Sequence, residues 1–288
     1  MPHAATGHPG PAPQPTPHSP GTPRLSARGV VKRFGATTAL AGVDVDVAAG
    51  ETLAVMGPSG SGKSTLLHCL AGILAPDAGT VRLGGTDIGT LNERERSLLR
   101  RRRLGFVFQF GQLLSELPAV ENVALPLMLQ GVARPEATRR AAEWLGALGL
   151  AGKEGRRPGE LSGGEAQRVA VARALVTGPE VVFADEPTGA LDQATGADVM
   201  RALTGATAAA GASLVLVTHD DQVAAWCSRR IHVRDGHVTH EATPARAGSW
   251  PSAAASAAPT APTAPGAPVA PAPGAPVAPG APAPGGAR

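Results

Sequence analysis

The eight residues GPSGSGKS, at positions 57–64, constrain the fold of this chain more than any other feature. They follow a short apolar run, Thr52 to Met56, and precede a stretch, 65–74, whose apolar residues recur at helical spacing. A glycine-rich turn between a buried strand and a helix lets backbone N–H groups and the helix N-terminus surround an anion. The run therefore predicts a phosphate-binding loop in an α/β domain.

Two side chains of this loop have chemistry of their own. Lys63 is placed to reach the β- and γ-phosphates of a nucleoside triphosphate, and the Ser64 hydroxyl is placed to ligate Mg²⁺. The other expected nucleotide contacts of the loop are Gly57, Ser59, Gly60, Ser61, Gly62 and Thr65. We therefore expect the chain to bind a nucleoside triphosphate with Mg²⁺.

A pair of carboxylates follows a second apolar run, EVVFA at 180–184. Asp185 would emerge at the C-terminal edge of that strand, beside the phosphate loop, and hold Mg²⁺ through water. Glu186 would point elsewhere and polarise an attacking water. A carboxylate pair at a strand end is often only a solvated loop, but the strand before it and the phosphate loop favour the catalytic interpretation.

Further strand and helix patterns alternate along the chain. Val43–Val47 alternates apolar and polar residues, Ser213–Thr218 is a buried-type strand, and Thr195–Ala210 is typical of a helix. This order predicts an α/β fold with a mostly parallel sheet covered on both faces. Residues from about 90 to 160, which contain an arginine-rich patch and helical patterns, predict a mostly helical subdomain inserted in this core.

Proline is concentrated at the two ends of the chain. Of 28 prolines, 20 lie in residues 1–24 and 244–288, which consist largely of Ala, Pro, Gly, Ser and Thr. Such segments cannot bury enough apolar surface to offset their ordering entropy, so we predict two disordered tails around a folded core at 25–243. For the C-terminal tail, a docking ligand for a proline-binding module is the alternative to a solvated appendage.

Composition excludes several classes of protein. No run approaches the roughly 18 to 20 apolar residues of a membrane-spanning helix, and the first 20 residues lack the basic and apolar regions of a signal peptide. The two cysteines form no CxxC pair, and a net charge of +3 gives no reason to expect a nucleic-acid partner. We therefore expect a cytoplasmic protein.

Motifs further along the chain resemble those of the ATP-binding cassette (ABC) ATPases. LSGGEAQRVAVARAL at 161–175 resembles the signature motif, and FADEPTGALD at 183–192 resembles the Walker B strand and D-loop. Gln109 matches the Q-loop, His219 the switch histidine, and Phe34 the aromatic residue that stacks on adenine. The resemblance extends from about residue 25 to 240.

The resemblance implies a P-loop NTPase fold with an additional antiparallel β region, and an ATPase that works as a head-to-tail pair. Ser162, Gly163 and Gly164 of one copy would close on the γ-phosphate of ATP held by the other. Glu186 would act as the base, His219 would contact the γ-phosphate, Asp192 would cross the seam, and Gln109 would link the metal to the helical subdomain. The pair could be a homodimer or a heterodimer with a homologous ATPase.

The resemblance is strongest to one branch of this family. Lys63 and Ser162 are 99 positions apart, which leaves no room for a long coiled coil. GFVFQFGQLLSELPAVENVALPL and DEPTGALD resemble the ATPases of lipoprotein release, macrolide export and cell division, which work with FtsX-like permeases. This implies a peripheral subunit on the inner face of the plasma membrane that drives export or lipoprotein and lipid extraction. The alternative is a non-transporting complex that signals to an extracellular enzyme, since the same motifs serve both.

Overall fold

The computed structural model describes residues 23–109 and 111–242, so the two expected tails fall outside the described residues except for positions 23 and 24. Its larger sheet has the strand order β10-β9-β3-β8-β7-β6. The strands are β3 (Thr52–Met56), β6 (Leu104–Phe108), β7 (Val181–Asp185), β8 (Ser213–Val217), β9 (Arg229–Arg234) and β10 (His237–Ala242). Neighbours from β9 to β6 are parallel, and β10 is antiparallel to β9. The predicted mostly parallel sheet is confirmed.

A second, antiparallel sheet packs beside the first. Its order is β2-β1-β4-β5, formed by β1 (Leu25–Phe34), β2 (Thr37–Val47), β4 (Ala78–Leu83) and β5 (Thr86–Asp87). Val43, Val45 and Val47 are buried while the aspartates between them are more exposed, as the alternation predicts. The additional antiparallel region is therefore confirmed.

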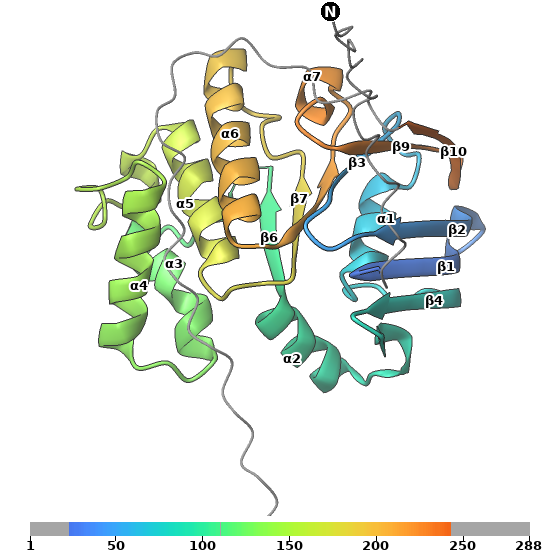
Figure 1. Cartoon of the computed structure of the whole chain (residues 1–288), viewed down its shortest axis with the longest axis horizontal. Helices are drawn as coiled ribbons and strands as arrows, with labels where there is room; N and C mark the ends of the chain where they lie inside the picture. The colour runs from blue at the N-terminus through green and yellow to red at the C-terminus, as the bar shows by residue number, and fades with distance from the viewer. Residues whose placement is uncertain (1–22, 110, 243–288) are drawn as a thin grey trace, which may run out of the picture.

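The larger sheet separates two hydrophobic cores. In β3, Leu53 and Val55 face the core shared with α1 (Lys63–Leu70) and the antiparallel sheet, whereas Ala54 and Met56 face the opposite core. Helices α5 (Gly163–Leu175) and α6 (Gln193–Ala209) cover that second face (Figure 1). Because successive strand residues point to opposite faces, the four buried apolar residues of this short strand contribute to both cores.

The interval 90–160 does not fold as one helical insertion. It contains α2 (Glu93–Arg103), α3 (Ala119–Leu129), α4 (Arg134–Ala147) and the short 3₁₀ helix η2 (Pro158–Glu160), but β6 lies among them and pairs with β7 in the larger sheet. The described chain also forms the 3₁₀ helix η1 (Ile88–Thr90) and α7 (Asp221–Ala224). The helical part that stands apart from the sheet therefore begins after Phe108, because the apolar run LGFVF is buried by strand pairing.

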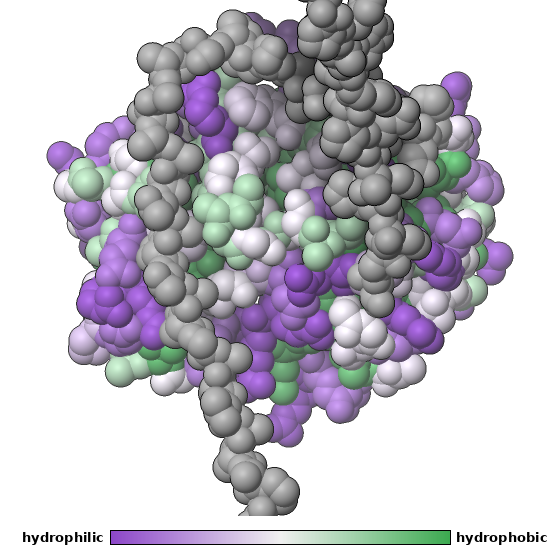
Figure 2. Space-filling model, in the orientation of Figure 1, coloured by the Kyte–Doolittle hydropathy of each residue, from purple (hydrophilic) through white to green (hydrophobic). Residues whose placement is uncertain are grey.

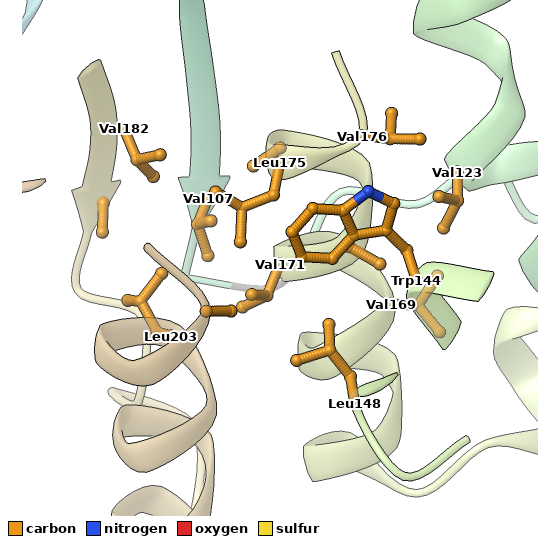
Figure 3. Close-up of a cluster of buried hydrophobic side chains, with 14 of the residues drawn as sticks. Val107, Val123, Trp144, Leu148, Val169, Val171, Leu175, Val176, Val182 and Leu203 are labelled. Carbon is orange, nitrogen blue, oxygen red and sulfur yellow. The ribbon is translucent and has the colours of Figure 1, made fainter. Parts of the chain in front are cut away.

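Trp144 joins the helical part to α5. Its ring lies among Val123 of α3, Val169 of α5 and Leu148, beside the side chains that link α5 to β6 and β7 (Figure 3). The outer surfaces of α2 and α4 are hydrophilic (Figure 2), with carboxylate–arginine pairs such as Glu93 with Arg100 and Glu136 with Arg140. None of the helices in the described ranges is long and apolar enough to cross a membrane.

Candidate nucleotide-binding site

The loop 57–64 is pressed between two strands that come from distant parts of the chain. Gly57 has φ 143°, and a Cβ there would stand 2.1 Å from the Val233 carbonyl oxygen of β9. Gly62 has φ 107°, and a Cβ there would stand 2.4 Å from the Ala39 carbonyl oxygen of β2. These close approaches explain why glycine is required at both ends of the loop.

Lys63 is buried at the first position of α1 and curls back over the loop. Its Nζ donates to the carbonyl oxygens of Gly57 and Pro58, at 2.8 and 2.7 Å. The Ser61 hydroxyl is also buried and has no hydrogen-bond partner among the described residues. A buried cation, an unpaired hydroxyl and a helix N-terminus in one loop fit the oxygens of a bound phosphate.

Asp185 and Ser64 meet where the parallel strands of the larger sheet end. The Ser64 Oγ lies 3.5 Å from Asp185 Oδ1, at the C-terminal end of β7. Burial raises the pKa of Asp185, and the hydrogen bond to Ser64 partly opposes this. A hydroxyl and a carboxylate beside a phosphate loop are the hard oxygen ligands that Mg²⁺ prefers.

Glu186 follows directly and turns the opposite way. Its φ is 47°, and its N–H donates to the Val217 carbonyl at the end of β8, at 2.9 Å. Its Oε1 lies 2.7 Å from Nδ1 of His219, and its Oε2 accepts from the Thr218 hydroxyl at 3.5 Å. A left-handed backbone at a non-glycine residue is costly and is typical of functional sites.

The loop that carries Gln109 is held by α5. A Cβ on Gly189 would stand 2.8 Å from Gln109 Nε2, so this side chain lies beside the segment after Glu186. Gln167 donates to the Phe108 carbonyl at 2.8 Å. Arg173 donates to the carbonyls of residues 111 and 112, at 2.6 and 2.7 Å.

The remaining expected residues form a second group at two helix N-termini. Ser162 caps α5, and Asp192 caps α6 by accepting from the N–H groups of residues 194 and 195. The two caps adjoin, since a Cβ on Gly164 would stand 2.4 Å from Thr195 Cγ2. Within the described ranges, no hydrogen bond joins these caps to the phosphate loop. Phe34 stands apart at the end of β1, half exposed, with Lys32 Nζ 5.7 Å from its ring centroid.

Several residues of the site were missing from the sequence prediction. Thr218 directly precedes His219 on the same strand end, so its place could have been inferred. The contacts of Gln167 and Arg173 with the Gln109 loop depend on how α5 packs against β6, and no motif signals them. The same holds for Lys153, which forms an ion pair with Glu165 in the first turn of α5.

The chain is similar to known proteins over most of its folded part, and this similarity identifies its family. Residues 40–189 match the family model described as ABC transporter. The chain belongs to the ABC transporter family. As an ABC ATPase it binds and hydrolyses ATP, and the predicted P-loop NTPase fold is confirmed.

Relatives of this ABC ATPase cover the folded part of the chain. It is 43% identical over 214 residues to the lipoprotein-releasing system ATP-binding protein LolD of Bacteroides thetaiotaomicron, covering 74% of this chain and 98% of that one. It is 44% identical over 232 residues to the macrolide export ATP-binding/permease protein MacB of Nitrosomonas europaea, covering 79% of this chain but only 35% of that protein. The dimeric post-hydrolysis structure of the ATP-binding cassette MJ0796, bound to ADP and Pi, has a TM-score of 0.70 and 37% identity, covering 76% and 98% of the two chains.

Proposed function

We propose that this chain is the ATPase subunit of a membrane complex, that it dimerises on ATP, and that it drives a separate FtsX-like permease in export or in lipoprotein and lipid extraction. The observation that carries the proposal is the cluster at the sheet edge. There, Lys63 lies inside the phosphate loop, Asp185 faces Ser64, and Glu186 is held by His219. The similarity to LolD over nearly its whole length supports this branch of the family.

The arrangement of the two helix N-termini supports a two-copy site. Helix α1, which begins in the phosphate loop, packs in one hydrophobic core, and α5, which begins after Ser162, packs in the other. The two anion-attracting N-termini are therefore on opposite faces of one sheet. We infer that Ser162, Gly163 and Gly164 serve ATP bound by a second copy, with Asp192 at the same seam.

The residues of one chain divide the proposed chemistry. Lys63 and the loop amides bind the phosphates, while Ser64, Asp185 and Gln109 would hold Mg²⁺, which supplies charge neutralisation at the transferring phosphoryl group. Glu186 orients water and accepts its proton, and His219 positions the Glu186 carboxylate and reaches the γ-phosphate. Phe34 offers an exposed aromatic face for adenine.

A groove beside the Gln109 loop suits the permease. It has a volume of about 500 Å³ and an apolar lining that includes Phe108, Leu125 and Leu129, the last of which is 57% exposed. Its charged lining residues are Arg100, Arg101 and Arg173. A permease segment with apolar and acidic side chains would complement it, and we propose that the chain binds peripherally on the cytoplasmic face of the plasma membrane through this groove.

The test uses Glu186→Gln, which keeps the side-chain shape but removes the base. We expect this variant to bind ATP, to lose hydrolysis, and to elute as a dimer with Mg-ATP but as a monomer without it. Adding Lys63→Ala should abolish the dimer. Hydrolysis at the wild-type rate would remove Glu186 from the role of base, and a variant that stays monomeric with ATP would contradict the two-copy site.

The partner is tested by affinity purification of tagged Glu186→Gln from detergent-solubilised membranes with Mg-ATP, followed by mass spectrometry. Recovery of an FtsX-like permease supports the proposal. Its extracellular domain then separates export from signalling to an external enzyme. Recovery of ribosomal or other soluble proteins alone would overturn the transporter assignment.

A further inference from the structure

A carboxylate lies at the helix N-terminus that is proposed to meet the γ-phosphate. Glu165, in the first turn of α5, accepts from the Ser162 N–H through Oε2 at 3.0 Å. This reciprocal cap stabilises the helix, and a negative charge at the helix N-terminus also interacts favourably with the helix dipole. The same charge stands within one turn of Ser162 and the two glycines, where it would repel an approaching phosphate.

Lys153 neutralises this carboxylate. It lies between α4 and η2, and its Nζ forms an ion pair with Glu165 Oε1, which leaves Oε2 for the Ser162 N–H. The contact with Lys153 is the main cause that lowers the pKa of Glu165, so the carboxylate is ionised at neutral pH. The Ser162 Oγ accepts from the Glu165 N–H at 3.3 Å, which leaves the hydroxyl proton available to a phosphate oxygen.

We propose that Lys153 is a positioning residue for ATP-driven dimerisation. Its ammonium cancels the charge of Glu165 beside the phosphate-binding N-terminus of α5 and keeps the carboxylate turned toward the helix cap. The inference rests on the proposed function, in which this N-terminus serves ATP held by a second copy. The repulsion that Lys153 removes concerns only the phosphate held by a second copy. ATP binding to the monomer is therefore independent of Lys153.

A simple structural role makes a different prediction from the charge role. If Lys153 only fastens its loop to α5, removing it weakens the dimer whatever the charge at position 165. If it cancels a charge, neutralising Glu165 removes the need for it. Glu165→Gln separates the two, because glutamine can still accept from the Ser162 N–H and so keeps the reciprocal cap.

The experiment measures the ATP concentration that half-saturates dimerisation, by light scattering, in the Glu186→Gln background. We expect Lys153→Met to raise it about threefold to tenfold, since an uncancelled Glu165 charge would then face a phosphate at each of two seams. Lys153→Met with Glu165→Gln should return to the background value. Arg139→Met, which removes an arginine from an exposed pair on α4, is the matched control and should change nothing.

Each outcome decides between the two roles. An unchanged half-saturation for Lys153→Met overturns the inference, and so does a double variant as impaired as the single one. Melting temperatures and monomer binding of a fluorescent ATP analogue show whether the variants are folded and loaded. If the background itself does not dimerise with ATP, the proposed function fails and this inference fails with it.

Discussion

At the scale of single residues, the site depends on positions where backbone and side chain leave no freedom. The loop glycines approach β2 and β9 so closely that a Cβ would meet a carbonyl oxygen. Glu186 adopts a left-handed backbone, which aims its carboxylate at His219 rather than at Asp185. The two neighbouring acids therefore contact different groups, Ser64 and His219, because the backbone turns at Glu186.

Lys63→Ala tests the loop directly. The buried ammonium is the cation inside the phosphate cradle, and losing charge-assisted hydrogen bonds should weaken ATP binding by about 10- to 100-fold. Isothermal titration calorimetry of the monomer measures this. Lys153→Ala, which removes a lysine outside the cradle, should bind ATP like the wild type. Undiminished affinity of Lys63→Ala would exclude the assigned role of the loop lysine.

At the scale of elements, one carboxylate joins three of them. Glu180, just before β7, accepts from Arg103 at the end of α2, at 2.5 and 3.0 Å, and from Arg24 next to β1, at 3.1 Å. The contact with Arg103 is the largest cause that lowers the pKa of Glu180 below its ordinary value of 4.5. The ion pairs fasten the antiparallel sheet and α2 to the start of β7.

Glu180→Gln should lower the free energy of unfolding by about 1 kcal/mol at pH 7, since the paired carboxylate is only partly exposed. A depressed folded-state pKa contributes stability above the unfolded pKa and loses it as pH falls through the folded one. The difference from wild type should therefore shrink below about pH 4.5 in urea titrations. As a control, Glu143→Gln, which breaks an exposed pair on α4, should lower the free energy of unfolding by only about a few tenths of that amount. A pH-independent difference would contradict the ionic explanation.

The elements also show what sequence can and cannot predict. The run Thr52–Met56 forms β3 with the expected bounds, because a short apolar run that leads into a phosphate loop predicts a buried strand. The run LGFVF falls inside the interval predicted to be mostly helical, and five apolar residues beside a basic helix have no decisive periodicity. Its pairing with β7, more than 70 residues later, makes it a strand. The candidate site residues lie in contiguous motifs and can be predicted from them, whereas the contacts of Gln167 and Arg173 with the Gln109 loop depend on tertiary packing and cannot.

At the scale of the whole molecule, α5 links the groove near α3 to the candidate site at the C-terminal end of β7. Arg173 of α5 lines the groove and holds the Gln109 loop, while the N-terminus of α5 is proposed to face ATP of the second copy. A partner that moves the groove would therefore displace both the Gln109 loop and the N-terminus of α5.

Leu129→Glu tests this link. A carboxylate in the apolar part of the groove should reduce recovery of the permease in affinity purification by about tenfold or more, because it removes an apolar contact and would compete with the acidic permease side chains for Arg100, Arg101 and Arg173. The ATPase rate of the isolated subunit should be unchanged. Leu114→Glu alters another exposed leucine that does not line the groove, and should leave recovery unaffected. Normal recovery with Leu129→Glu would place the docking surface elsewhere.

The contact between Gly57 and Val233 has a consequence for biosynthesis. The phosphate loop is made early, but β3 pairs with β8 and β9, and Val233 of β9 closes over Gly57. A growing chain that has emerged only to residue 200 lacks both neighbours of β3, so its loop has no support on that side. We therefore expect the cradle to be completed only when nearly the whole domain has left the ribosome, so that a nascent chain gains the proposed ATP site in one late step rather than gradually.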